Sequence, residues 1–522
     1  MKYFKFILIL CIAHINSALA SDSIKIVNPV YVSSLEKSLF DDFIQKKNAN
    51  TIMISLALDS TLNKQSAEQY IYKLNSFIAE NSDKIKNATN DKNRVNYITK
   101  VLTKEYLKKY EPADNLTSLF NEGKYAIISA LIVYSTILDK MEIPYSISEK
   151  SGVITLMTYP STSAIPITFK NIKPLVYIPD QELKTNFVDF LLDSKMISKS
   201  ELSKKGTDVI FEEHFFAKSD LTITGLVGYQ YFNKAIDFIN KQDYKNAVHA
   251  LEKSYILYPS DRTFFLLNQT LIEIVQEDAF SDFDNVPYFS KLASYTTANS
   301  IRDFVIGKFS MITNDYLVTT DRVDWYDKIY DRLNTDIPNN EIKKQISDIY
   351  YLSKSRYLIV KQDYNKAWDV IVNAYKNNPE NYEAIELLQN LFLEISRKKL
   401  RTDNFEEYYF KKIEEYPILT KNDKVLMLGG YYYAENIREI YFLKDDLVED
   451  KTLSEFEEFM KKYNYQPESY IVGQCYGEIA SYYYRKHDHK KCKATINRGL
   501  QISPGNKDLI NKYRINYPNE GK

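Results

Sequence analysis

Two nearly identical segments, KQDYKNA at 241–247 and KQDYNKA at 361–367, decide how the chain is organised. Each segment lies between two helical patterns, and a proline follows each at the same distance, Pro259 and Pro379. Self-similarity of this kind is typical of chains built from stacked supersecondary units. We therefore predict that both segments are the turns of helical hairpins. Each proline should end the second helix, because proline cannot continue an α-helix.

The residues around these turns resemble the tetratricopeptide repeat, a pair of antiparallel helices about 34 residues long. Small residues let two helix axes approach to about 8–10 Å, and bulky ones fill the groove between turns. The pattern's small, bulky and proline positions are occupied by Ala235, Ala247, Leu251 and Pro259 in a first unit, by Ser355, Ala367, Ile371, Ala374 and Pro379 in a second, and by Ala480, Cys492, Ile496, Gly499 and Pro504 in a third.

The stretches between these units, 262–340 and 380–465, also show helical patterns but lack the signature. One helical pair cannot bury its apolar face alone, so a continuous stack from about 225 to 518 is expected. Glycine and proline are scarce, 13 and 15 among 522 residues, as suits helices joined by short turns. We assign residues 223–522 to this tetratricopeptide-like domain.

The resemblance places partner contacts on the first helix of each pair, which lines the concave surface of such a stack. In the first two units these positions are mostly apolar, and neighbouring helices or the N-terminal domain can fill the groove there; they are Tyr229, Phe232, Ile236 and Ile239, then Ile349, Leu352, Arg356 and Ile359. In the third unit they are polar, and we expect them to be open. The predicted contact residues are Gln474, Ser481, Tyr484, Arg485, Arg356 and Tyr229, with Tyr484 and Arg485 preferred.

Residues 21–222 predict a separate α+β domain. Helical patterns cover about 31–48 and 64–110, and an apolar helix follows a turn. Three runs with strand-like alternation come next. The expected elements of this second part are a helix at 126–140, a break at Pro144, and strands at 145–150, 153–159 and 164–170.

This order of elements resembles the core of the transglutaminase-like cysteine hydrolases, within the papain-like group. There, a Gly-x-Tyr-x-Cys turn begins the helix, a Gly-Ile-Pro-Tyr segment leads to a strand, and a histidine opens the next strand. Gly123-Lys124-Tyr125 and Ile143-Pro144-Tyr145 match the framework, whereas Ile127 takes the place of the cysteine and Gly152 that of the histidine. The resemblance implies a thiol at a helix N-terminus with its base on the strand beside it.

The residues for that chemistry are missing. No cysteine occurs between residues 12 and 474, and no histidine between residues 15 and 213. Ser129 lies two residues beyond the lost cysteine without a local histidine, so we interpret it as a helix-packing serine. We therefore predict a degenerate domain with no catalytic residue.

No cofactor or metal site is expected. No phosphate-cradling glycine loop is present in the sequence. His487-Asp488-His489 falls on the turn of the third unit and lacks further ligands, so we interpret it as a solvated turn. His214, beside two glutamates, lacks a recognised metal spacing and is interpreted in the same way.

The first twenty residues predict export. Lys2 and Lys5 precede an apolar run, and Ala18-Leu19-Ala20 offers a cleavage site, so we expect a cleaved signal peptide at 1–20 and a periplasmic or extracellular location. Lipoprotein anchoring at Cys11 is not expected, because Leu10 stands where such signals have a small residue. The net charge of -1 favours neither nucleic acid nor an anionic membrane surface, and no transmembrane segment is expected.

The expected fold is thus mainly α, with an α+β transglutaminase-like pseudoenzyme domain followed by a tetratricopeptide-type α-solenoid. The joining of these two parts resembles exported bacterial proteins. We expect a non-catalytic binding or scaffold protein that acts on a protein partner or peptide. Two alternatives stay open: a hydrolase with altered chemistry on the same scaffold, and an inert cleft that binds peptide or cell-wall material.

Overall fold

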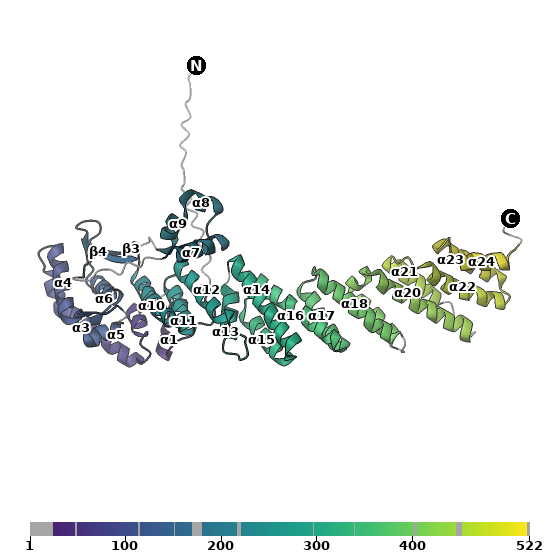
Figure 1. Ribbon diagram of the computed structural model, residues 1–522, viewed down its shortest axis with the longest axis horizontal. Helices are drawn as coiled ribbons and strands as arrows, with labels where there is room; N and C mark the ends of the chain where they lie inside the picture. Colours follow the sequence, from purple (N-terminus) through teal and green to yellow (C-terminus); the bar gives the residue numbers. More distant parts are fainter. Residues whose placement is uncertain are drawn as a thin grey trace, which may run out of the picture. The chain divides into compact units, whose positions relative to one another are not determined.

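The computed structural model describes residues 25–46, 50–112, 115–150, 152–169, 180–216, 221–295, 297–338, 340–400, 404–444 and 451–518. The expected signal peptide and Cys11 lie outside these residues. The chain divides into two compact units, Met1–Ile312 with Asp324–Lys343, and Thr313–Val323 with Lys344–Lys522. The described residues are mainly helical, as the sequence predicts, with two small sheets in the first unit (Figure 1). Among them, no helix combines the length and the apolar character that crossing a membrane requires.

The amino-terminal part of the first unit is built around α6 (Ile127–Lys140), most of whose residues are buried. A helix that is apolar on all sides belongs in a core. The predicted helix over 64–110 is two helices, because Asn87 ends the first and the Asn90 side chain caps the second. The other helices of this part are α1 (Ser34–Lys46), α2 (Thr51–Leu56), α3 (Lys64–Lys86), α4 (Asp91–Glu105), α5 (Leu116–Glu122), α7 (Gln181–Asp193), α8 (Lys199–Lys205) and α9 (Thr207–Phe215).

The two predicted strands after Pro144 form an antiparallel hairpin, β3 (Tyr145–Lys150) and β4 (Val153–Thr158). The third is shorter than predicted: β5 (Ile165–Pro166) pairs only with the end of β4. Proline has no N–H to donate to a sheet, which limits the length of such an edge strand. A second sheet pairs β1 (Lys109–Tyr110) with β2 (Lys124–Tyr125) in parallel.

Helical hairpins follow along the rest of the chain. The first unit continues with α10 (Ile223–Asn240), α11 (Tyr244–Leu257), α12 (Asp261–Gln276), α13 (Val286–Tyr295), α14 (Asn299–Thr313) and α15 (Val323–Asp336). The second contains η1 (Asn314–Thr319), α16 (Glu341–Val360), α17 (Tyr364–Asn377), α18 (Tyr382–Lys399), α19 (Phe405–Glu415), η2 (Pro417–Lys421), α20 (Asp423–Arg438), η3 (Glu439–Lys444), α21 (Lys451–Tyr463), α22 (Ser469–Arg485), α23 (His489–Ile502) and α24 (Lys507–Asn516).

The three turns recognised in the sequence share one backbone geometry. They join α10 to α11, α16 to α17 and α22 to α23. The middle residues Gln242, Gln362 and His487 have φ angles of 59°, 63° and 62°. This left-handed conformation is uncommon for residues other than glycine. Its recurrence at the same place in three turns supports the register that the sequence comparison proposed.

An aspartate follows each of these three left-handed residues, and it recurs because its side chain caps the next helix. The side chains of Asp243, Asp363 and Asp488 each accept a hydrogen bond from the backbone N–H three residues further on. An aspartate at this position satisfies one of the unpaired donors at a helix start. The Asp488 carboxylate is therefore engaged as a helix cap between His487 and His489, both of which are exposed.

The division into compact units does not fall at residue 222, where we expected the boundary between the two domains. The helix α10 packs against α6 and α2, and its residues Leu226, Val227 and Tyr231 belong to the same buried core as the amino-terminal helices. Apolar side chains of the first helical hairpin therefore pack into the amino-terminal core. They do not face only the neighbouring hairpins.

Candidate functional site

The position of the lost cysteine offers no nucleophile. Ile127 is the first residue of α6 and is half-buried. The buried Ser129 hydroxyl accepts a hydrogen bond from the Ala126 N–H at 3.0 Å and donates one to the Ala126 carbonyl at 2.9 Å. Both bonds tie the serine to the start of its own helix, as in a capping arrangement. The hydroxyl is thus engaged by the backbone and not by a general base.

The position of the lost histidine is a turn glycine. Gly152 joins β3 to β4 with a φ of 77°, and a Cβ atom there would lie 3.2 Å from the ring of Phe216. Glycine suits such a turn because it adopts positive φ without a steric penalty. A histidine in this place would have to strain the hairpin and displace the phenylalanine.

We expect Ser129→Ala to reduce stability and to change nothing else. Its cost should be about 1–2 kcal/mol of unfolding free energy, because losing the buried hydroxyl removes the partner of the Ala126 N–H. Urea unfolding of the mature chain measures it. The control is Ser66→Ala: the Ser66 hydroxyl makes the same two bonds with the Asn63 backbone near the surface, both at 3.0 Å, and its loss should cost less. A loss of peptide or ester turnover at unchanged stability would contradict the capping role.

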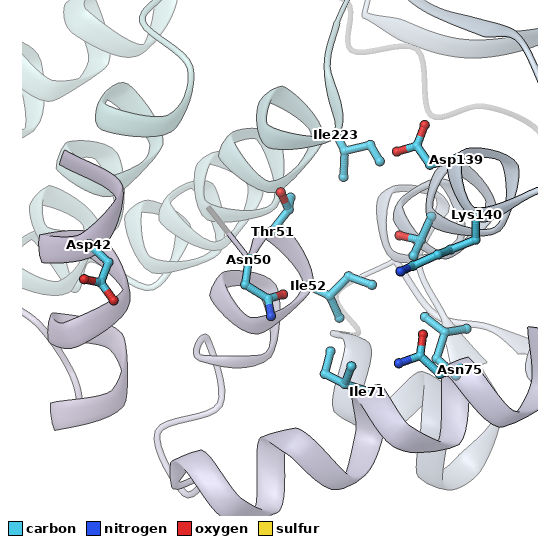
Figure 2. A pocket seen from close by; sticks show the side chains of 11 residues that line it. Asp42, Asn50, Thr51, Ile52, Ile71, Asn75, Asp139, Lys140 and Ile223 are labelled. Atoms are coloured by element: carbon cyan, nitrogen blue, oxygen red, sulfur yellow. The ribbon is translucent and has the colours of Figure 1, made fainter. Parts of the chain in front are cut away.

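A cavity of about 590 Å³ lies near the other end of α6 (Figure 2). Asp139 and Lys140 border it opposite Asn50, with Ile52 and Ile71 between them. Twelve residues separate Asp139 from Ile127, which is about 18 Å along a helix. The cavity is therefore not a remnant of the lost catalytic place.

The cavity has both polar and apolar walls. It extends into a neighbouring hollow that shares Thr51, Asp139 and Ile223 and is bounded by Tyr145. Asp42 and Asn50 line it from either side of residues 47–49, which the structure does not describe. We therefore assign no ligand to it.

Buried ion pairs surround the first helical hairpin, α10 and α11. Glu36 on α1 accepts from the Lys253 ammonium at 3.0 Å, and Glu252 pairs with Lys291 at 2.6 Å. Tyr231 and Tyr295 donate their hydroxyls to Glu36 and Glu252, at 2.9 and 2.8 Å. A third pair joins Glu149 on β3 to Arg262 on α12 at 3.1 Å. Removing one partner from such a pair is costly, because the other charge stays buried.

Tyr229 is covered by this arrangement. Its hydroxyl donates to Glu149, and the Arg262 guanidinium lies 4.8 Å from the centre of its ring. Burial raises the pKa of Tyr229 well above its usual value. Only 5% of the residue is exposed, so Tyr229 is not accessible to a partner, contrary to our expectation. Of the four positions expected to line the first groove, Tyr229 and Phe232 are buried within the first unit, whereas Ile236 and Ile239 are half-buried.

In the second unit, contacts between successive first helices align a set of exposed and half-buried side chains. Arg356 on α16 donates to Glu383 on α18 at 2.9 Å. Gln474 on α22 donates to Glu435 on α20 at 3.1 Å. Residues three or four positions apart share one side of a helix. We use the name first-helix face for the side chains of Arg356, Glu383, Glu386, Tyr431, Glu435, Tyr470, Gln474 and Glu478.

The first-helix face is acidic and aromatic. It has four carboxylates and one guanidinium, and Tyr431 and Tyr470 are 36% and 53% exposed. Partial burial, followed by the nearby Glu468 and Tyr431, raises the pKa of Tyr470. Exposed tyrosines beside charges suit protein recognition, because an aromatic ring offers large contact area with a polar end.

The other three predicted contact residues lie further along α22. The Ser481 hydroxyl accepts from the Lys512 ammonium on α24 at 3.0 Å, so the last helix covers it. Arg485 donates to the Tyr441 carbonyl of η3 at 2.7 Å. Tyr484 is 42% exposed, with its ring 5.4 Å from that of His489. Of the predicted set, only Arg356 and Gln474 belong to the first-helix face.

The sequence interpretation did not find Glu383, Tyr431, Glu435 or Tyr470. The first three lie in 380–465, where the repeat signature is absent, and Tyr470 lies just before the first matched residue of the third unit. The sequence did contain a signal for this face. Polar and aromatic residues recur at spacings of three and four along 382–399 and 423–438.

The described residues form a mainly α protein with successive helical hairpins and, on its second unit, an exposed acidic and aromatic face. No protein-family model matches the chain, and no curated protein matches it by sequence.

Proposed function

We propose that this chain is an exported, non-catalytic binding protein that holds a protein partner or peptide against the first-helix face. The observation that carries the proposal is the alignment of Arg356 with Glu383 and of Gln474 with Glu435 across successive helices. Helical stacks use such surfaces for recognition. The acidic character of the face favours a partner segment with lysine or arginine side chains.

The same proposal includes the nature of the two parts. We take the hairpins of 223–522 as a tetratricopeptide-type α-solenoid and 21–222 as a degenerate transglutaminase-like domain. The common geometry of the turns at Gln242, Gln362 and His487 supports the first interpretation. The strand order after Pro144 supports the second. A periplasmic or extracellular location follows from the expected signal peptide.

The alternatives receive less support. A hydrolase with altered chemistry needs an activated nucleophile near the start of α6, and the Ser129 hydroxyl is bonded to the Ala126 backbone there. The cavity beside Asp139 and Lys140 is the feature that favours an inert cleft. It lies away from the lost catalytic place, so it does not support a cleft inherited from the enzyme family.

We expect the double variant Tyr431→Ala, Tyr470→Ala to weaken partner binding by roughly tenfold or more, since exposed aromatic residues at protein interfaces commonly contribute 1–2 kcal/mol each. The test is selection from a displayed peptide library on immobilised mature chain, followed by affinity measurement of the enriched peptides. The peptides should be rich in lysine and arginine. Their binding should weaken as salt rises, because exposed charges are screened.

The matched control is Tyr72→Ala, which removes a tyrosine that is 75% exposed in the first unit. This variant should bind the selected peptides as the unchanged chain does. Peptides that bind equally well to the double variant, or that carry no basic residues, would refute the assignment of the first-helix face.

A further inference from the structure

The third turn differs from the other two in charge but not in shape. Residues 485–491 read RKHDHKK, whereas the matching residues read NKQDYKN at 240–246 and VKQDYNK at 360–366. All three turns have the same left-handed middle residue and the same capping aspartate. Arg485, whose position holds no cation in either matching turn, and the two histidines are therefore not needed to form the turn.

The basic character continues through the last helix. Residues 485–518 contain nine lysines and arginines and two aspartates, although the whole chain has a net charge of -1. Of the two aspartates, Asp488 is engaged as a helix cap and lies 3.8 Å from Lys491. Segment 485–518 is therefore strongly basic although the net charge of the whole chain is close to zero.

Contacts between α23 and α24 bring these residues to one end of the helices. The Tyr517 hydroxyl donates to the His489 carbonyl at 2.7 Å. The Lys493 ammonium lies 5.7 Å from the centre of the Tyr517 ring. The end of α24 therefore lies beside the start of α23. Figure 1 shows the two helices next to each other. We use the name basic edge for Arg485, Lys486, Lys490, Lys491, Lys493 and Arg514.

Exposed apolar side chains accompany these charges. Ile515, next to Arg514 at the end of α24, is 75% exposed, and Tyr484 precedes Arg485 at the end of α22. An isoleucine left in water beside cations has no packing role in this unit. Cations with a neighbouring apolar and an aromatic side chain form the combination by which proteins bind an anionic membrane surface, where the cations meet headgroups and the apolar groups insert between them.

We propose that the basic edge binds the headgroup surface of an anionic phospholipid bilayer, without crossing it. Ends of helices and a turn project outward and suit an extended planar surface better than an extended peptide. The exposed Ile515 favours a lipid surface over an acidic protein segment, since a soluble acidic chain offers it no apolar layer to enter. The two named surfaces share no residue, although Arg485 follows Gln474 and Glu478 along one side of α22, and this proposal does not depend on the function proposed for the first-helix face.

The experiment is co-sedimentation of the mature chain, residues 21–522, with vesicles of phosphatidylcholine alone or with 30% phosphatidylglycerol. We expect binding to the anionic vesicles only, and a steep decrease as the salt concentration rises. The test variant carries Arg485→Asn, Lys491→Asn and Arg514→Gln. The first two changes copy the 240–246 turn, where Asn246 donates to the capping Asp243 at 2.8 Å. Binding should weaken by roughly a hundredfold, at about 1 kcal/mol for each lysine or arginine near an anionic surface.

A second variant, Ile515→Ser, should weaken vesicle binding several-fold while leaving the charge unchanged. The control variant Lys376→Gln, Lys411→Gln, Lys421→Gln removes three exposed cations elsewhere in the second unit and should retain most of the binding. Thermal unfolding checks that all variants fold. Equal loss in the test and control variants would overturn the proposal, as would binding to soluble poly-glutamate but not to anionic vesicles. The double variant Tyr431→Ala, Tyr470→Ala should bind vesicles normally, so the two proposals can fail separately.

Discussion

Replacing Glu36 with alanine is expected to lower the free energy of unfolding of the first unit by about 3–5 kcal/mol. The Glu36 carboxylate is fully buried and accepts hydrogen bonds from Lys253, from Tyr231 and from the Val32 N–H, the last at 2.7 Å. Without it, the Lys253 side chain must either keep an unpaired charge or give up its proton, in a place where only 2% of the residue is exposed. Burial lowers the pKa of Lys253, and Glu36 is the main group that opposes this effect.

Urea unfolding of the mature chain measures this loss. The compensating variant Glu36→Leu, Lys253→Met should recover most of the stability, because replacing both partners by apolar groups leaves no charge unpaired. The surface control is Glu414→Ala, which breaks the exposed pair with Lys462, where the two charged atoms are 2.6 Å apart. It should cost less than about 1 kcal/mol. If Glu36→Ala cost no more than the surface control, the buried pair would not hold α1 to the hairpins.

The parts of the fold that depend on local signals could be predicted from the sequence. The turns at 241–243 and 361–363 were recognised because nearly the same seven residues recur, each followed by a proline at the same distance. The helix over Ile127–Lys140 and the strands of the β3–β4 hairpin were found because apolar spacing differs between helices and strands.

The buried charges could not be predicted in this way. Glu36 and Lys253 are 217 residues apart, and nothing along the chain indicates that they meet. Glu252 and Lys253 are adjacent in α11, where charged neighbours normally mark a solvated helix side, yet both are buried. For the same reason Tyr229 was predicted to be a contact residue: the partners that cover it, Glu149 and Arg262, come from other elements.

The repeat signature and the net charge of the whole chain did not indicate the first-helix face or the basic edge. The repeat signature describes how helices pack, so it is silent about Tyr431 on α20, whose exposed side does not take part in packing. The net charge of the whole chain says nothing about where charges gather, and the basic segment 485–518 became meaningful only beside the matching turns. A count of charges along the chain was the signal available for the second feature.

The second large effect concerns His249 on α11. Its Nε2 atom lies 2.9 Å from the Tyr288 hydroxyl. Burial, followed by the nearby cations Lys291 and Lys253, lowers the pKa of His249 from 6.5 to about 4, which Asp243 only partly opposes. The folded protein therefore keeps this imidazole neutral at a pH where the unfolded chain protonates it.

The sign of the pH dependence follows from this difference. Between pH 6.5 and 4 the unfolded state binds a proton that the folded state does not, so stability falls as the pH is lowered through this window. The shift corresponds to a loss of about 2–3 kcal/mol after allowance for partial exposure of the ring. Glu252 acts in the opposite direction: burial raises its pKa, so its contribution to stability is greatest at low pH and decreases as the pH rises.

Because these contributions overlap, the effect of His249 must be measured as a difference between two proteins. The unfolding free energy of both proteins should fall between pH 7 and pH 4. We expect it to fall by about 2–3 kcal/mol less in His249→Gln than in the unchanged chain. The glutamine amide can still bond to Tyr288. Urea unfolding at several pH values measures this, with His487→Gln in the exposed turn as the control, which should follow the unchanged chain. Parallel stability curves for His249→Gln and the unchanged chain would show that protonation of this imidazole does not oppose folding, and would leave the carboxylates as the cause of any acid sensitivity.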